Sequence, residues 1–302
     1  MEKLNIIHNK SNTNKIEKED YFLVNFNGES ILTKIQHFKK WYKVISFVNW
    51  IRTDDYISEQ TIYKQWHPIQ KEQAISIIKN NENIEKTKHH IESELDIILS
   101  EENAEKEFLE ILNKRPQLNK NLILKALTIS KKYHSGQKRN EWSNYIIHPI
   151  RVATYAMIDF MDTECVISAL LHDTLEDTNI SENEIEENFW PKVLHLTMLL
   201  TKNNKELWDY YSSIANDNNA VIIKWYDRLN NIYSLFLDSD TSRTNNYITR
   251  TEKEVLPLLE WQESYENIKN IINILKTDKT IKHKYQEKLA TLHRIQEMEE
   301  NL

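Results

Sequence analysis

Glycine, proline and cysteine are scarce in this chain of 302 residues, which contains 2 Gly, 5 Pro and 1 Cys. With so little glycine, the chain has no GxGxxG run and no Walker-type run, which excludes the phosphate-binding loops of Rossmann and P-loop proteins. A single cysteine, Cys165, excludes an intrachain disulfide framework and a thiolate metal site. The scarcity of turn-forming residues and the long stretches of helical periodicity predict a mostly α-helical fold.

Long apolar runs and an excess of positive charge are also missing. No apolar stretch approaches about 18 residues, and the N-terminal sequence MEKLNIIHNK does not resemble the hydrophobic part of a signal peptide. A cytoplasmic location without membrane association is therefore expected. The formal net charge is −7, so the overall charge does not indicate a nucleic-acid-binding protein. An anionic ligand would need a local cluster of Lys and Arg.

The N-terminal part of the chain carries few signals. Apolar segments flank Asn27-Gly28 within residues 21–35 and predict a β-hairpin, because Asn-Gly suits a type I′ turn. Residues 38–51, rich in aromatic and β-branched side chains, are interpreted as a small buried core. Residues 55–115 are expected to form two or three helices.

Pro116 and the polar residues after it predict a domain boundary. Residues 1–116 are then an extension of unknown function, either α or α+β and containing the hairpin. Residues 117–302 are expected to form the second domain.

The sequence LHDTLEDT, residues 171–178, is the strongest candidate for a site. Residues four apart share one face of an α-helix, so His172 is expected beside Glu176, and Asp173 beside Asp177. The preceding residues are apolar enough for a buried helix. Three acids and a histidine at the end of such a helix are costly unless a ligand binds them. The alternative is a solvated helix end with capping acids.

Two cations and a histidine precede this segment. A helix is predicted to end at Gly136, and the loop after it carries Lys138 and Arg139. His148 stands before Pro149. Because proline is favoured at the first helical position, His148 is expected at the N-cap of the next helix.

A second polar stripe is predicted on the helix of residues 219–236. Asp227, Asn231 and Ser234 fall on one face, with Lys224 three residues before the aspartate. Such a stripe is often a solvent-exposed face, but an aspartate on a largely apolar helix is also a candidate site residue.

The segments GQKR…YIIHPIRVA, ALLHDTLEDT and IKWYDRLNN share their order and spacing with the H…HD…D set of HD-superfamily metal phosphohydrolases. Over about residues 120–260 they resemble the hydrolase domain of the RelA/SpoT family. That resemblance implies an HD-type helical bundle in which one divalent metal ion is bound by His148, His172, Asp173 and Asp227. Two imidazoles and two carboxylates suit Mn²⁺, Fe²⁺, Co²⁺ or Zn²⁺, and the family resemblance selects Mn²⁺.

The same resemblance assigns further roles. Glu176 and Asp177 would activate and orient the attacking water, and Arg139 would lie against the nucleotide base. The other positions matched to nucleotide binding are Lys138, Lys224, Arg228, Asn231 and Ser234. The implied reaction is hydrolysis of the 3′-pyrophosphate of (p)ppGpp, giving GDP or GTP and pyrophosphate.

Two positions depart from the family pattern. Asn140 replaces a basic residue, and the DRLHN of the long enzymes reads DRLNN, with Asn230. Neither is expected to touch the metal ligands, so only base preference is put in question. Too few residues follow Leu235 for a synthetase domain, which favours a hydrolase-only protein of the small alarmone hydrolase type.

Two other functions stay open. One is an HD phosphohydrolase for (p)ppApp or for a phosphorylated dinucleotide such as NADPH. The other is a non-catalytic nucleotide sensor. The expected partner is a guanine or adenine alarmone, and the oligomeric state is open.

Overall fold

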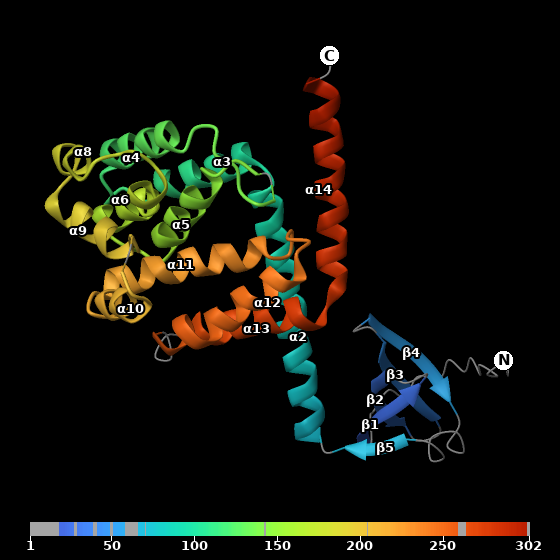
Figure 1. Cartoon of the computed structure of the whole chain (residues 1–302). Coiled ribbons are helices and arrows are strands. Elements are labelled where there is room, and N and C mark those ends of the chain that lie inside the picture. Colours follow the sequence, from blue (N-terminus) through green and yellow to red (C-terminus); the bar gives the residue numbers. More distant parts are fainter. Residues whose placement is uncertain are drawn as a thin grey trace. The chain divides into compact units, whose positions relative to one another are not determined.

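In a computed structural model the chain forms two compact units, Met1–Lys86 and Thr87–Leu302 (Figure 1). The structure describes residues 18–26, 29–38, 41–48, 51–57, 66–69, 71–141, 143–203, 205–258 and 264–300. Among these residues, no helix combines the length and low polarity that crossing a lipid bilayer requires.

The first unit contains a five-stranded antiparallel sheet in the order β4-β3-β2-β1-β5. Its strands are β1 (Lys18–Phe26), β2 (Glu29–Phe38), β3 (Trp41–Val48), β4 (Ile51–Ile57) and β5 (Trp66–Ile69). The pairing of Phe26 with Glu29 confirms the predicted hairpin. Asn27 and Gly28 themselves, and the burial of residues 38–51, lie outside the described part of the chain.

Two helices follow the sheet, α2 (Lys71–Ile98) and α3 (Glu101–Asn113). Among the described residues of the range 55–115, the two helices agree with the predicted two or three, but the prediction is wrong for the end of β4 and for β5. The chain is divided between Lys86 and Thr87, within α2, whereas the sequence predicted a boundary at residue 116. The reason is that α3 packs on α5 (Ile147–Ile158) of the second unit. Assigning a separate function to residues 1–116 stays a prediction.

The second unit is mostly helical, as predicted, and its described elements are helices apart from one isolated bridge between Lys138 and Asn144. After α3 and α5, the remaining elements are α4 (Lys120–Tyr133), α6 (Thr163–Leu171), α7 (Thr174–Asp177), α8 (Glu182–Asn188), α9 (Pro191–Leu200), α10 (Leu207–Ala215), α11 (Asn218–Ser234), α12 (Thr241–Arg250), η1 (Thr251–Val255), η2 (Leu256–Leu258), α13 (Ser264–Thr277) and α14 (Lys279–Glu300).

Helices α5 and α6 form the centre of this unit. Every residue from 147 to 157 in α5 and from 165 to 171 in α6 is buried. Helix α5 packs against α3, α6 and α11, and α6 also packs against α4 and α9, as Figure 1 shows. The core therefore surrounds the ends of two apolar helices, and these ends carry His148 and His172.

Local capping explains several helix ends. Asp162 accepts a hydrogen bond from the backbone N–H of Cys165 (2.9 Å) and begins α6, and Ser181 begins α8 in the same way. Gly136 has φ of 78°, a left-handed conformation that suits the chain reversal after α4.

Helix α5 begins at Ile147, so His148 lies in its first turn and the expected N-cap position is wrong. Pro149 is tolerated there because the first N–H groups of a helix have no intrahelical partner.

Candidate active site

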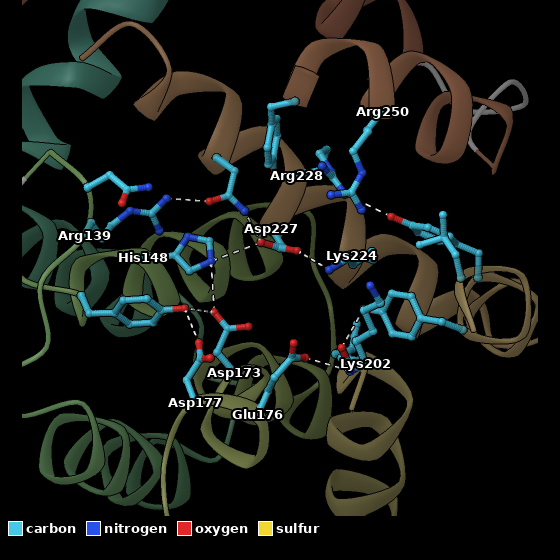
Figure 2. Close-up of a pocket in the computed structure, with 18 of the residues that line it drawn as sticks. Arg139, His148, Asp173, Glu176, Asp177, Lys202, Lys224, Asp227, Arg228 and Arg250 are labelled. Carbon is cyan, nitrogen blue, oxygen red and sulfur yellow. Dashed lines mark hydrogen bonds and ion pairs between the residues drawn. The ribbon is translucent and has the colours of Figure 1, made fainter. Parts of the chain in front are cut away.

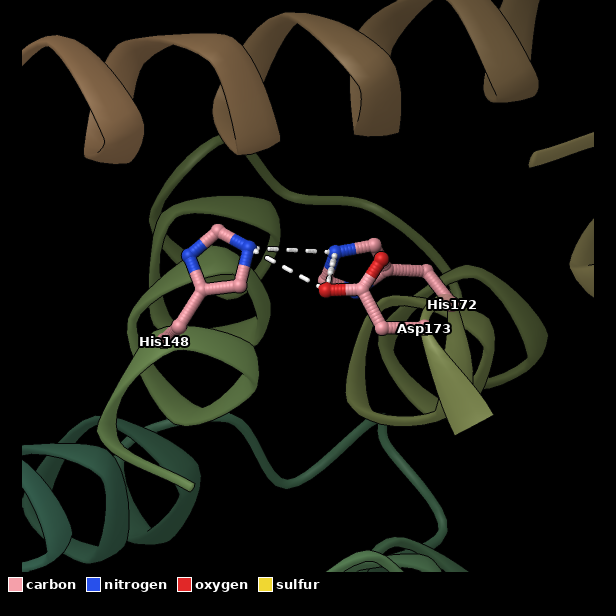
Figure 3. A group of neighbouring side chains, drawn as sticks. All are labelled: His148, His172 and Asp173. Atoms are coloured by element: carbon pink, nitrogen blue, oxygen red, sulfur yellow. Dashed lines mark hydrogen bonds and ion pairs between the residues drawn. The ribbon is translucent and has the colours of Figure 1, made fainter. Parts of the chain in front are cut away.

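The two histidines meet at the centre of the second unit. His148 and His172 are each 2% exposed, and their Nε2 atoms are 3.3 Å apart (Figure 3). Asp173 follows His172 and places Oδ2 3.1 Å from His172 Nε2 and 3.5 Å from His148 Nε2. The ligand atoms of these three residues all lie within 4.8 Å of one another.

Asp227 joins this cluster from α11. Its Oδ1 atom is 3.2 Å from His148 Nε2 and 4.0 Å from His172 Nε2. Its Oδ2 atom forms an ion pair with Lys224 Nζ at 2.6 Å. The structure thus brings together all four residues that the motifs predicted as metal ligands.

Hydrogen bonds on the far side of each ring decide which nitrogen faces the cluster. His172 Nδ1 lies 2.8 Å from the carbonyl oxygen of Ala169, and His148 Nδ1 lies 2.7 Å from Asn230 Oδ1. A carbonyl oxygen only accepts, so each Nδ1 donates. In the neutral rings both Nε2 lone pairs then point at the cluster, as in metal-binding histidines. The expectation that Asn230 does not touch the ligand set is wrong.

The charges of the cluster favour a bound cation. Burial alone lowers the pKa of His172, but Asp173 and Asp227 outweigh it and raise that pKa to about 9. Burial raises the pKa of Asp227, yet Lys224 and the two histidines hold it well below its usual value. Two imidazole nitrogens and two ionised carboxylates around one point suit a divalent metal ion.

The acidic pair Glu176–Asp177 lies beside the cluster on the short helix α7. The segment is not one continuous helix, because α6 ends at Leu171 and α7 begins at Thr174. Glu176 Oε2 accepts the backbone N–H of Lys202 at 2.8 Å. Asp177 Oδ2 lies 2.8 Å from the hydroxyl of Tyr145.

Tyr145 is a site residue that the sequence motifs did not single out. Its hydroxyl lies 2.7 Å from Asp173 Oδ2 as well as 2.8 Å from Asp177 Oδ2. Burial and the two carboxylates raise the pKa of this hydroxyl, so it stays protonated. The hydroxyl has one proton and two carboxylate acceptors, so Tyr145 links Asp173 to Asp177. It is the first residue of the YIIHPIRVA segment, three residues before His148, but the resemblance was not used to give it a role.

Arg139 is held by two polar side chains. Its Nε donates to Glu141 Oε1 at 2.9 Å, and its Nη2 donates to Asn231 Oδ1 at 2.6 Å. Asn231 Nδ2 in turn donates to Asp227 Oδ1 at 2.5 Å. Arg139 is therefore connected through one amide to the cluster.

A cavity of about 370 Å³ opens over the cluster. It is lined by most of the predicted nucleotide-contact residues and by Asn140, which departs from the family pattern. It is also lined by side chains that no motif indicated: Lys202, Tyr210, Tyr211, Tyr247 and Arg250. In Figure 2, Arg139 lies on one side of this cavity and Lys202, Lys224, Arg228 and Arg250 on the other, with His148, Asp173 and Asp227 between them. Ser234 is buried outside the lining, with its hydroxyl 3.4 Å from the carbonyl oxygen of Asn230.

Tyrosine side chains contact Arg228 and Lys224 on the side of the cavity opposite Arg139. Arg228 Nη2 donates to the hydroxyl of Tyr211 at 3.1 Å, and its guanidinium lies 4.5 Å from the ring centre of Tyr247. Lys224 Nζ lies 5.5 Å from the ring centre of Tyr210. The cavity thus combines several lysine and arginine side chains with the His/Asp cluster. This combination suits a ligand with several negative charges, such as a phosphorylated compound.

Comparison with known proteins agrees with this geometry. A family model described as the HD domain matches residues 126–206. The guanosine-3′,5′-bis(diphosphate) 3′-pyrophosphohydrolase of Aquifex aeolicus is 35% identical over 154 residues, which cover 48% of this chain and 22% of that protein. The probable enzyme of the same name from Mycoplasma pneumoniae is 34% identical over 132 residues, which cover 38% of this chain and 18% of that protein.

A solved structure described as a metazoan ortholog of SpoT that hydrolyses ppGpp covers 52% of this chain and 96% of its own, with a TM-score of 0.45 and 23% identity. This chain aligns with only about a fifth of the length of the curated relatives. Residues 126–206 match the HD domain, and the chain contains a segment homologous to proteins named guanosine-3′,5′-bis(diphosphate) 3′-pyrophosphohydrolase.

Proposed function

We propose that this protein hydrolyses the 3′-pyrophosphate of (p)ppGpp, releasing GDP or GTP and pyrophosphate. The observation that carries the proposal is the convergence of two imidazole nitrogens and two carboxylates under a cavity lined by cations. The names of the relatives from Aquifex and Mycoplasma support the substrate and the bond that is broken.

His148, His172, Asp173 and Asp227 would hold one metal ion, for which we propose Mn²⁺. The donor set suits several divalent ions, and the resemblance to the RelA/SpoT family favours Mn²⁺ among them. When bound, the ion supplies Lewis-acid polarisation of a phosphoryl oxygen and lowers the pKa of water.

The acidic pair would handle the attacking water. Glu176 is exposed at the cavity and is the carboxylate we assign as proton acceptor. Asp177 shares the Tyr145 hydroxyl with Asp173, so these side chains would orient the water rather than accept its proton.

The two sides of the cavity would bind different parts of the nucleotide. Lys202, Arg228 and Arg250 would face the phosphates, because guanidinium and ammonium groups pair well with phosphate oxygens. Arg139 would stack on the purine, and its bonds to Glu141 and Asn231 would hold the guanidinium in place.

A substrate panel tests this proposal. Purified protein with Mn²⁺ would be assayed for release of pyrophosphate or phosphate from ppGpp, pppGpp, ppApp and NADPH. Pyrophosphate release, fastest from ppGpp or pppGpp and abolished in Asp173→Ala, is the expected result. Faster turnover of NADPH or ppApp would assign the site to the other HD phosphohydrolase class. Nucleotide binding without turnover of any compound would favour a sensor.

A further inference from the structure

Asn230 is a buried amide directly behind one of the proposed metal ligands. It is 2% exposed and lies on α11, three residues after Asp227 and therefore on the same side of the helix. Its Oδ1 atom lies 2.7 Å from His148 Nδ1.

The direction of this amide decides the chemistry of His148. With Oδ1 facing the ring, Nδ1 must donate, and Nε2 offers its lone pair to the cluster. With the amide reversed, Nδ2 would donate to Nδ1, and the proton of the neutral ring would move to Nε2. That proton would point at His172 Nε2, 3.3 Å away, and His148 could not bind a metal.

The rest of this amide makes no competing hydrogen bond. Among the described residues, Asn230 Nδ2 is buried and has no hydrogen-bond partner. The side chain therefore acts through Oδ1, which faces His148 Nδ1 and requires that nitrogen to donate.

We propose that Asn230 is a positioning residue that holds His148 in the metal-binding tautomer. The inference rests on the proposed metal site.

Metal titration of the full chain tests it. Metal-stripped protein would be titrated with Mn²⁺ for wild type, Asn230→Leu and Asn230→Asp. Asn230→Leu has no acceptor and should weaken binding by roughly 10–100-fold, the usual effect of losing a partner of a ligating histidine. Asn230→Asp keeps an acceptor oxygen and should bind metal about as tightly as wild type.

Folding stability distinguishes positioning from packing. Asn230→Leu leaves the buried Nδ1–H of His148 without an acceptor, and Asn230→Asp adds a buried carboxylate, so both variants should unfold more easily than wild type. If metal affinity simply followed stability, both variants would bind metal more weakly. Binding in Asn230→Asp that is weakened as much as in Asn230→Leu would overturn the inference, and so would wild-type affinity in Asn230→Leu.

The ring nitrogens give a readout that needs no metal. Nitrogen-15 spectra of histidine-labelled protein, with the His148 signals assigned by their loss in His148→Gln, should show a protonated Nδ1 in wild type and a changed tautomer in Asn230→Leu. Failure of the wild type to bind metal would overturn the metal site and this inference together. Metal binding that depends on Asn230, in a protein that leaves ppGpp intact, would overturn only the proposed function.

Discussion

Arg151 on α5 should be among the most sensitive positions for stability. Its side chain is 0% exposed, and it pairs with Glu94, which is 6% exposed, and with Glu107. In Arg151→Met, Glu94 keeps only the hydroxyl of Tyr155 as a partner. Removing one member of a buried ion pair costs about 3–5 kcal/mol, because the other charge stays buried and uncompensated. That is a large part of the roughly 5–15 kcal/mol that stabilises a typical folded protein.

Urea unfolding followed by far-UV circular dichroism would measure this loss. The double variant Arg151→Met/Glu94→Gln removes the stranded charge but keeps a polar partner for Tyr155. It should therefore recover about 2–3 kcal/mol relative to Arg151→Met alone, because the uncompensated charge makes up most of the cost. The double variant also keeps the test usable if the single variant does not fold.

An exposed ion pair provides the matched control. Lys192 Nζ and Asp162 Oδ2 are 2.6 Å apart, but their side chains are 42% and 48% exposed. Lys192→Met should cost no more than about 1 kcal/mol, since water and salt screen such a pair. A loss in Arg151→Met as small as in Lys192→Met, or a double variant no more stable than the single one, would refute the reasoning.

Three further predictions concern the site and the stability at low pH. Glu176→Gln keeps the shape but cannot accept a proton, so kcat should fall by roughly 10²–10⁴ with unchanged metal content in elemental analysis. A variant that lost its metal would place Glu176 among the ligands. Arg139→Ala should raise KM for ppGpp more than it lowers kcat. A preference between ppGpp and ppApp beyond about a thousandfold, roughly 4 kcal/mol, would contradict recognition by stacking. Burial raises the pKa of Asp278, but Lys88, with Nζ 2.8 Å from Oδ2, outweighs this and lowers that pKa to about 2. The stability from this pair is therefore present above the unfolded pKa of 3.8 and is lost as the pH falls towards 2. Thermal melts of Asp278→Asn should show a shallower decline between those pH values, and an unchanged decline would count against the pair.

The cluster could be predicted from the sequence because its members stand at motif positions, and the two histidines are tied to helix ends. His148 and His172 lie in the first turn of α5 and just after the last residue of α6, where side chains of separate helices meet. Lys202 and Arg250 carried no such signal. Lys202 follows α9 and Arg250 ends α12, and only the tertiary fold brings them to the cavity.

The sheet of the first unit was predicted only at its hairpin. Strand β4 carries Arg52, Asp54 and Asp55, so it lacks the apolar alternation of a half-buried strand. Strand β5 has four residues and contains Pro68, which is compatible with its place at the edge of the sheet. Asn230, in contrast, was within reach of sequence reasoning, because its spacing from Asp227 already placed it on the inner side of α11.

Helix α11 also limits how this protein can change in length. One continuous helix carries Lys224, Asp227, Asn230 and Asn231, so their directions are set by the number of residues between them. A single residue inserted between Asp227 and Asn230 would turn everything beyond it by about 100° around the helix axis. The amide would then leave His148 while Asp227 stayed in place. Among related sequences, we therefore expect insertions and deletions in the loops before α10 and after α11, and none within this stretch of α11.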